Sequence, residues 1–163
     1  MILFVSLILL LVLTILGVAL ARTQTVEERL SQNEVNHQIA FQAADAARRA
    51  AMNNLFASCL NNCTLILTSA SIFDSGVAGL YDIQQEAGNS IVDTINWSNA
   101  AQVMVYDGAP LTSLPAASQN PAYIIEKLAG FNSKNYYRVV AHGWGPDGTS
   151  AVTIQQIFIG LAH

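Results

Sequence analysis

Residues 1–30 read MILFVSLILLLVLTILGVALARTQTVEERL, and the first 21 of these residues decide how the rest of the chain is interpreted. This opening run carries no charge, and only Ser6, Thr14 and Gly17 interrupt its apolar side chains. At the helical rise of about 1.5 Å per residue the run covers roughly 30 Å, the thickness of the hydrocarbon core of a bilayer. It is therefore predicted to form a helix that can span a membrane.

A cleaved secretory signal is a poorer interpretation of the same run. Such a signal has a basic region, an apolar core of about 7 to 15 residues and a small-residue cleavage site. Here the apolar run is longer, no Lys or Arg precedes it, and GVALARTQ leads directly into a helix-forming stretch. We therefore expect a retained single-pass membrane helix whose preceding residues have been removed by processing.

The chain divides by composition into three parts. Residues 1–21 are the transmembrane part of a long helix, residues 22–57 are its amphipathic continuation, and residues 58–163 form a globular head. The length beyond the apolar run suits one modest domain. The net charge is −4, and the seven Lys and Arg residues are scattered, so no direct contact with nucleic acid is expected.

The amphipathic part is predicted to continue the membrane helix without interruption. It contains no Pro, and the only Gly before residue 76 is Gly17. Small and apolar side chains recur at helical spacing and predict a narrow face that packs closely against a sheet. These side chains are Phe41, Ala44, Ala47, Ala51 and Leu55.

Four strands are predicted after an irregular connecting region that follows the helix. Pro146, Asp147 and Gly148 form a typical turn between the last two strands, because Pro fixes φ, Asp caps the turn and Gly accepts positive φ. The pattern predicts an α+β fold, in which the long helix packs against a four-stranded antiparallel sheet. The predicted strands cover residues 103–106, 121–128, 136–143 and 149–160.

The alternation within the last two strands predicts a sheet with two distinct faces, one of which should cover the Ala-rich helix. Tyr137, Val139 and Ala141 alternate with Tyr136, Arg138, Val140 and His142. In the last strand the apolar residues follow the same period, with a predicted slip near Gln155 and Gln156.

Cys59 and Cys63 form a C-x3-C pair in a chain expected to be exported, where disulfides form readily. The spacing permits a bridge at a helix end or in a tight turn. Two separate thiols, or a metal or redox pair, remain alternatives. The bridge would fasten the end of the long helix, since so short a loop constrains the unfolded chain only slightly.

No enzyme, metal or cofactor is expected from the remaining residues. The three histidines do not pair with other ligands at metal-site spacing, and no hydrolase, phosphate-binding or dinucleotide-binding motif is present. Four aspartates are expected to cap turns, since calcium would require a denser acidic spacing. Trp97 and Trp144 are interpreted as core residues, with interface anchors as the alternative. The histidines are His37, His142 and His163, and the aspartates are Asp74, Asp82, Asp93 and Asp107.

Several stretches resemble the PilX family of type IV pilus minor pilins. The apolar start followed by RTQTVEERLSQNE and HQIAFQAADAA is similar to the N-terminal region of that family. GLYD, VDTINWS, PAYIIEKL and YYRVVAHGWGPDGTSAVTIQQIF are similar to its later blocks. The resemblance spans nearly the whole chain and implies a pilin fold.

The resemblance also implies how the subunit is processed and assembled. A prepilin peptidase would cut before Met1, which would then be methylated on its amine. The subunit would wait in the inner membrane with a periplasmic head and would then enter a filament whose core is made of apolar helices. Packing in that core is expected from Met1, Phe4, Val5, Leu9, Val12 and Leu16.

One departure from most pilins points to a position in the filament. Most pilins have Glu at mature position 5, where it pairs with the N-terminal amine of a neighbour, whereas this chain has Val5. The PilX group and its secretion-system counterpart GspK resemble each other in tending to lack this Glu. The resemblance therefore implies a minor pilin that helps initiate assembly at the extracellular tip.

The partners implied are other minor pilins, the major pilin, a large tip adhesin, the prepilin peptidase, the inner-membrane assembly platform and, before assembly, lipid. Such a filament can serve adhesion, twitching motility and DNA uptake. The alternatives are a type II secretion pseudopilin and a membrane-anchored periplasmic binding or sensor protein. A basic leader ending in Gly before Met1 would favour the pilin interpretation over the sensor.

Overall fold

The computed structural model describes residues 2–62, 73, 78–84, 90–106, 117–131 and 134–161. One long helix is followed by short and then long strands, which confirms the predicted α+β fold class. The elements are helix α1 (Ile2–Asn62), strand β1 (Leu80–Asp82), the 3-10 helix η1 (Ile91–Asp93) and strands β2 (Met104–Val105), β3 (Ala122–Phe131), β4 (Lys134–Trp144) and β5 (Ala151–Leu161).

Helix α1 is unbroken over 61 residues, and it ends five residues later than the sequence suggested. No Pro interrupts it, and Gly17 is its only Gly, so nothing within it removes a hydrogen bond from the helix. The chain forms two structural units, residues 1–35 and residues 36–163, and α1 contributes to both. We call the second the head unit and describe each unit by itself.

The sheet of the head unit has five strands instead of the predicted four. The order is β1-β3-β4-β5, and β2 also pairs with β3. Strand β1 runs parallel to β3, whereas all other pairs are antiparallel. Because β4 occupies one edge of β3, β1 and β2 share the other edge. Strand β1 was missed because only three residues of it pair, too few to show a period.

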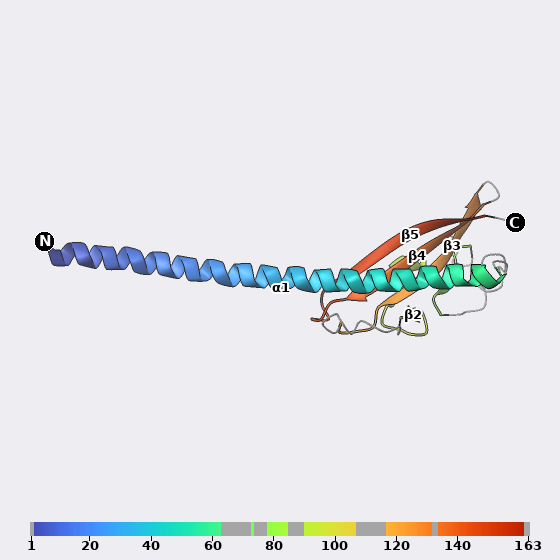
Figure 1. Ribbon diagram of the computed structural model, residues 1–163, viewed down its shortest axis with the longest axis horizontal. Helices are drawn as coiled ribbons and strands as arrows, with labels where there is room; N and C mark the ends of the chain where they lie inside the picture. The colour runs from blue at the N-terminus through green and yellow to red at the C-terminus, as the bar shows by residue number, and fades with distance from the viewer. Residues whose placement is uncertain are drawn as a thin grey trace. The chain divides into compact units, whose positions relative to one another are not determined.

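The C-terminal half of α1 lies along one face of the sheet (Figure 1). Its small side chains meet the sheet residues Tyr123, Ile125, Tyr137, Val139 and Ala141 in one buried cluster. The alternation predicted for β4 is therefore confirmed. The buried residues of the helix are Ile39, Ala40, Ala43, Ala44, Ala47, Ala51 and Leu55.

Phe41 is the exception to the predicted helix face, because 52% of it is exposed. The buried face runs instead through Ala40, Ala43 and Ala44. Here the helix backbone approaches β4 so closely that a Cβ placed on Gly143 would lie 2.4 Å from the carbonyl oxygen of Ala40. No room remains for an aromatic ring at this crossing, and Phe41 lies outside it.

The opposite face of the sheet is covered as well, which the sequence did not predict. Val103 packs on Ala122, Ile124, Val140 and Trp144, and side chains of the η1 region complete this second cluster. We call residues 90–103 the covering segment. The sheet of the head unit is therefore an inner layer between α1 and the covering segment.

The predicted slip near Gln155 and Gln156 is wrong. Strands β4 and β5 pair without a shift over their whole length, from Lys134↔Leu161 to Trp144↔Ala151. Gln156 keeps the alternation and lies on the helix-facing side, where it meets a polar partner on α1. The one irregularity in the long strands is between Leu128 and Phe131 of β3.

Candidate membrane-spanning segment and the head it carries

Every apolar side chain described between Ile2 and Leu20 is exposed, and no charged residue interrupts the segment. Its two hydroxyl groups are satisfied inside the helix. Ser6 Oγ donates to the carbonyl oxygen of Leu3 at 2.9 Å, and Thr14 Oγ1 donates to that of Leu11 at 2.8 Å. Because hydrocarbon offers no hydrogen-bond partners, this internal satisfaction lets the segment lie in lipid. By length and composition it can cross a membrane.

The residues predicted for filament packing lie on this exposed surface. Phe4, Val5, Leu9, Val12 and Leu16 are 47% to 69% exposed, whereas Met1 lies outside the described residues. The last four of them recur at intervals of four, three and four residues, the spacing of a continuous seam on one side of a helix. The structure thus makes these side chains available, and their role in a filament stays a prediction.

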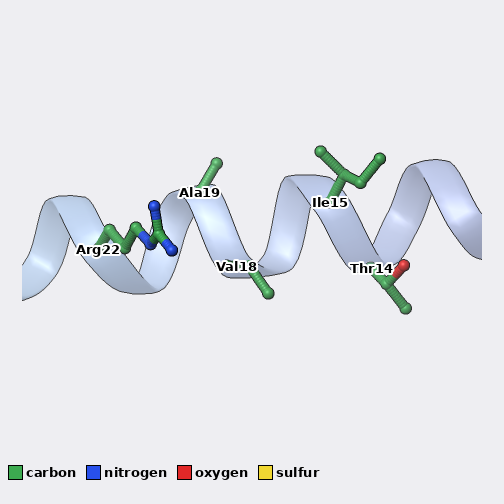
Figure 2. Close-up of a pocket in the computed structure, with 5 residues that line it drawn as sticks. All are labelled: Thr14, Ile15, Val18, Ala19 and Arg22. Carbon is green, nitrogen blue, oxygen red and sulfur yellow. The ribbon is translucent and has the colours of Figure 1, made fainter.

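Two shallow grooves lie between the side chains of this segment. One is lined by Val5, Ile8, Leu9, Val12 and Leu13. The other is lined by Thr14, Ile15, Val18, Ala19 and Arg22, which Figure 2 shows projecting from a single stretch of helix. A single helix cannot enclose a small ligand. Grooves of this kind instead receive the side-chain ridges of a neighbouring helix, or lipid chains.

Polar contacts fasten the C-terminal half of α1 to the sheet. Arg48 Nη1 donates to Gln156 Oε1 at 2.7 Å, and Arg48 Nη2 donates to Asp45 Oδ1, also at 2.7 Å. Burial raises the pKa of Asp45, but the guanidinium groups of Arg48 and Arg49 outweigh it and hold that pKa below its ordinary value. Asp45 is therefore charged, and it binds the guanidinium group of Arg48, which contacts Gln156 of β5.

A buried ion pair joins the covering segment to the other face of the sheet. Glu126 of β3 is fully buried and pairs with Arg138 of β4, whose Nε donates to Glu126 Oε2 at 2.8 Å. The second carboxylate oxygen accepts the backbone N–H of Ile91 at 3.2 Å, and Arg138 Nη2 donates to Ser90 Oγ. The pair thus fixes the start of the 3-10 helix η1 on the sheet. Nothing in the local sequence pattern had indicated this network.

The short strand β1 is held by a second charge pair. Lys127 Nζ lies 3.2 Å from Asp82 Oδ2, and both side chains are largely buried. The predicted turn-capping role of Asp82 is also present, because its Oδ1 accepts the backbone N–H of Gln84 at 2.9 Å. Burial, together with the nearby Asp82 charge, raises the pKa of Tyr137.

Both tryptophans belong to the core on the face of the sheet that carries the covering segment. Trp144 is 8% exposed, and Trp97 of the covering segment packs against the same cluster. The His142 ring stacks on Trp97 with centroids 5.0 Å apart and meets the edge of Trp144 at 4.6 Å. Its Nδ1 lies 2.8 Å from Thr153 Oγ1. Burial lowers the pKa of His142, so the neutral ring is favoured.

The turn between β4 and β5 has the predicted chemistry. Gly148 has a φ of 70°. Asp147 Oδ1 accepts the backbone N–H groups of Thr149 and Ser150 at 3.1 and 2.9 Å. These bonds, with those from the two hydroxyls, lower the pKa of Asp147. Asn36 Nδ2 donates to Asp147 Oδ2 at 3.3 Å and so ties the turn to the helix at the start of the head unit.

Some predicted site residues fall outside what the structure describes. This applies to Cys63 and to the side chain of Cys59, so the disulfide stays a prediction, and to Asp74, Asp107 and His163. In the described parts of the chain, no group of three or more His, Cys, Asp or Glu residues could hold a metal ion. Ser90 caps η1, because its side chain accepts the backbone N–H of Val92, whereas Asp93 is an acidic residue within the first turn of η1. His37 is exposed on α1.

Two family models match the sequence, and together they cover nearly all of it. Residues 1–49 match PilX N-terminal, and residues 44–160 match the type IV pilus assembly protein PilX C-term. No curated protein and no solved structure matches significantly. The C-terminal match alone covers more than half of the chain and includes the described strands of the sheet up to residue 160 of β5. The chain therefore belongs to the PilX family of type IV pilus assembly proteins.

Proposed function

We propose that this protein is a minor pilin that helps to start the pilus at its tip and supports the display of a tip adhesin. Its family comprises structural components of the pilus and implies interaction with other pilus components during assembly. The tip position, the adhesin and the processing of the chain are proposals. The observation that carries them is an apolar segment whose described apolar side chains are all exposed and which has Val5 where most pilins have Glu.

The exposed segment has two successive environments in this proposal. The subunit first waits in the inner membrane, with lipid around residues 1–21 and its head in the periplasm. It then exchanges lipid for the apolar helices of its neighbours in the filament. Both environments are apolar. In either of them the hydroxyl groups of Ser6 and Thr14 keep their hydrogen bonds, because they donate to carbonyl oxygens of the same helix. Cleavage and methylation at Met1 would prepare the segment for this exchange.

Val5 supports a place at the tip for an electrostatic reason. In hydrocarbon, an unpaired amine or carboxylate is costly, so a pilin with Glu at this position gains by meeting the amine of a subunit installed before it. A side chain without charge has no such requirement. A subunit of this kind can enter first, before any neighbour is present.

Val5→Glu tests the tip position directly. An epitope tag on the head is imaged by immunogold on pili from cells that make the unmodified chain, Val5→Glu or the control Val5→Leu. We expect label at filament ends for the unmodified chain and for Val5→Leu, and label along the shafts for Val5→Glu. Label along the shafts with the unmodified chain would refute the tip position, and an unchanged pattern for Val5→Glu would refute the role of Val5.

Deletion of the gene tests the wider role in assembly. If the subunit helps to start filaments, deletion lowers the number of pili per cell, and expression of the intact chain restores it. The Val12→Glu variant is a further control for Val5→Glu. It also puts a carboxylate into the apolar segment, but at a position other than that of the Glu that pairs in most pilins. A deletion strain with normal pili would contradict the proposed function.

A further inference from the structure

Strand β5 is the last strand on one side of the sheet, within the part of the chain that the structure describes. Its 11 residues pair with β4 along the whole strand, and no described strand pairs with its other edge. Figure 1 shows β5, in orange to red, as the outermost strand. The opposite edge of the sheet differs, because β3 is covered there by both β1 and β2. Among the described strands, β5 therefore presents one long edge without a paired strand.

This edge lacks the features that usually prevent further pairing. Edge strands are commonly short, bulged, or protected by Lys, other charges or Pro. Strand β5 reads AVTIQQIFIGL, without a charge or Pro, and its register with β4 has no shift. A regular strand exposes its N–H and C=O groups in a row that matches only another extended backbone. The geometry of the edge thus specifies the kind of partner.

Side chains beside the edge add an apolar surface at one end of β5. Ile157 and Ile159 are 60% and 59% exposed. They lie opposite Arg138 and Tyr136 of β4 and hence on the sheet face that carries the covering segment. A strand added to β5 would place alternate side chains next to these isoleucines and remove them from water.

We propose that β5 receives an extended strand from a different component of the pilus, which continues the sheet of the head unit. The partner strand is uncharged where it pairs and carries apolar side chains at alternate positions, opposite Ile157 and Ile159. Backbone hydrogen bonds would supply affinity, and the alternate side chains would supply specificity. The inference concerns a surface of the head and does not depend on where in the filament the subunit lies.

A second copy of this chain is a poorer occupant of the edge. Antiparallel pairing of two β5 strands creates a two-fold axis perpendicular to the sheet. The helix α1 of the second copy would then run in the opposite direction to that of the first. Chains whose helices enter their heads from one membrane run in the same direction. Neighbouring copies in that membrane therefore do not meet in this way, whereas a strand from another protein can.

Position-specific photo-cross-linking in pilus-producing cells tests the proposal. A photo-reactive residue replaces Gln155, Ile157 or Ile159 in turn in the full chain, and the cross-linked peptides are sequenced. A paired strand predicts that the partner residue moves by two positions whenever the probe moves by two, in one constant direction. The same probe at Val105, an exposed residue of β2, is the control and should not reach that segment.

The variants Ile157→Lys and Ile159→Lys test the apolar surface beside β5 while the photo-reactive residue stays at position 155. Charge on an edge strand opposes pairing, so each variant should lower the yield of the Gln155 cross-link about tenfold, whereas Val105→Lys should leave it unchanged. All three positions are exposed, and the thermal unfolding of the chain should stay within a few degrees of wild type. If neither Lys variant lowers the yield of the cross-link from position 155, the proposal is overturned.

The remaining outcomes are also decisive. Cross-links without a constant register, cross-links only to β5 of another copy, or no cross-link in cells that assemble pili would each refute strand addition at β5. These results would leave the proposed function intact as long as gene deletion still lowers the number of pili per cell. Conversely, a constant register in a strain whose pili do not need the protein would support the surface and refute the assembly role.

Discussion

Replacing Gly143 with alanine is expected to separate the helix from the sheet. Gly143 lies in β4, and a Cβ placed on it would stand 2.4 Å from both the Ala40 carbonyl oxygen and the Ala44 nitrogen. Both are backbone atoms of α1, so no side-chain rotation can relieve the contact. The helix would have to withdraw by about 0.6 Å to reach even the 3.0 Å limit that real Cβ atoms respect.

The size of the effect follows from what that withdrawal disturbs. A radial gap of about 0.5 to 1 Å removes roughly a quarter to a half of the dispersion energy of each contact. Here it would affect the fully buried row formed by Ala40, Ala43, Ala44 and Ala47. Overpacking of a core costs about 1 to 3 kcal/mol, and we expect the upper end, about 3 kcal/mol, because backbone must move. The melting temperature should then fall by roughly 10 °C.

The assay is thermal unfolding of the full chain in detergent micelles, followed by near-ultraviolet circular dichroism of the buried aromatic side chains. Gly130→Ala is the matched control, because its nearest contact would be 3.3 Å, to the Lys134 carbonyl oxygen, at an exposed end of β3. That variant should change the free energy of unfolding by less than about 1 kcal/mol. If Gly143→Ala unfolds within about 0.5 kcal/mol of wild type, the close approach of helix and sheet is refuted.

Two further predictions concern the covering segment. Arg138→Met leaves the carboxylate of Glu126 buried without its cation and should cost about 3 kcal/mol in urea unfolding; adding Glu126→Gln should recover much of that loss, and an additive double variant would contradict the buried pair. His142 titrates below its ordinary pKa of 6.5 because it is buried, so the unfolded chain takes up the proton first and stability falls as the pH drops through that region. Unfolding measured at about pH 7.5 and 5 should therefore show a smaller acid loss for His142→Gln than for wild type, and an equal loss would refute the argument.

The local pattern of the sequence was sufficient for the main elements. An apolar run without Pro predicted the helix, and period-two alternation around Tyr137, Val139 and Ala141 predicted β4. The Asp147 turn followed from residue chemistry at three positions. Each of these predictions depends on neighbours within a few residues, and such interactions are the part of folding that a sequence displays directly.

Other features depended on which distant residues meet. The Glu126 and Arg138 pair is buried only because residues 90–103 close over the sheet, and neither side chain signals that cover in its own strand. Strand β1 forms because three of its residues pair with the edge of β3 that β4 does not occupy. Pairing of this kind has no periodic signature, since a three-residue strand is shorter than the pattern that would identify it.

The sequence by itself determined that this chain has a long exposed apolar helix, a head with an antiparallel sheet, and the motifs of the PilX family. Only the tertiary structure decided that Ala40 and Ala43, instead of Phe41, face the sheet, and that no described strand pairs with the outer edge of β5. The physical reason is that composition and period fix what each element is. The side of an element that is buried depends on how closely two backbones approach, and at Gly143 that distance is set by residues about a hundred positions apart.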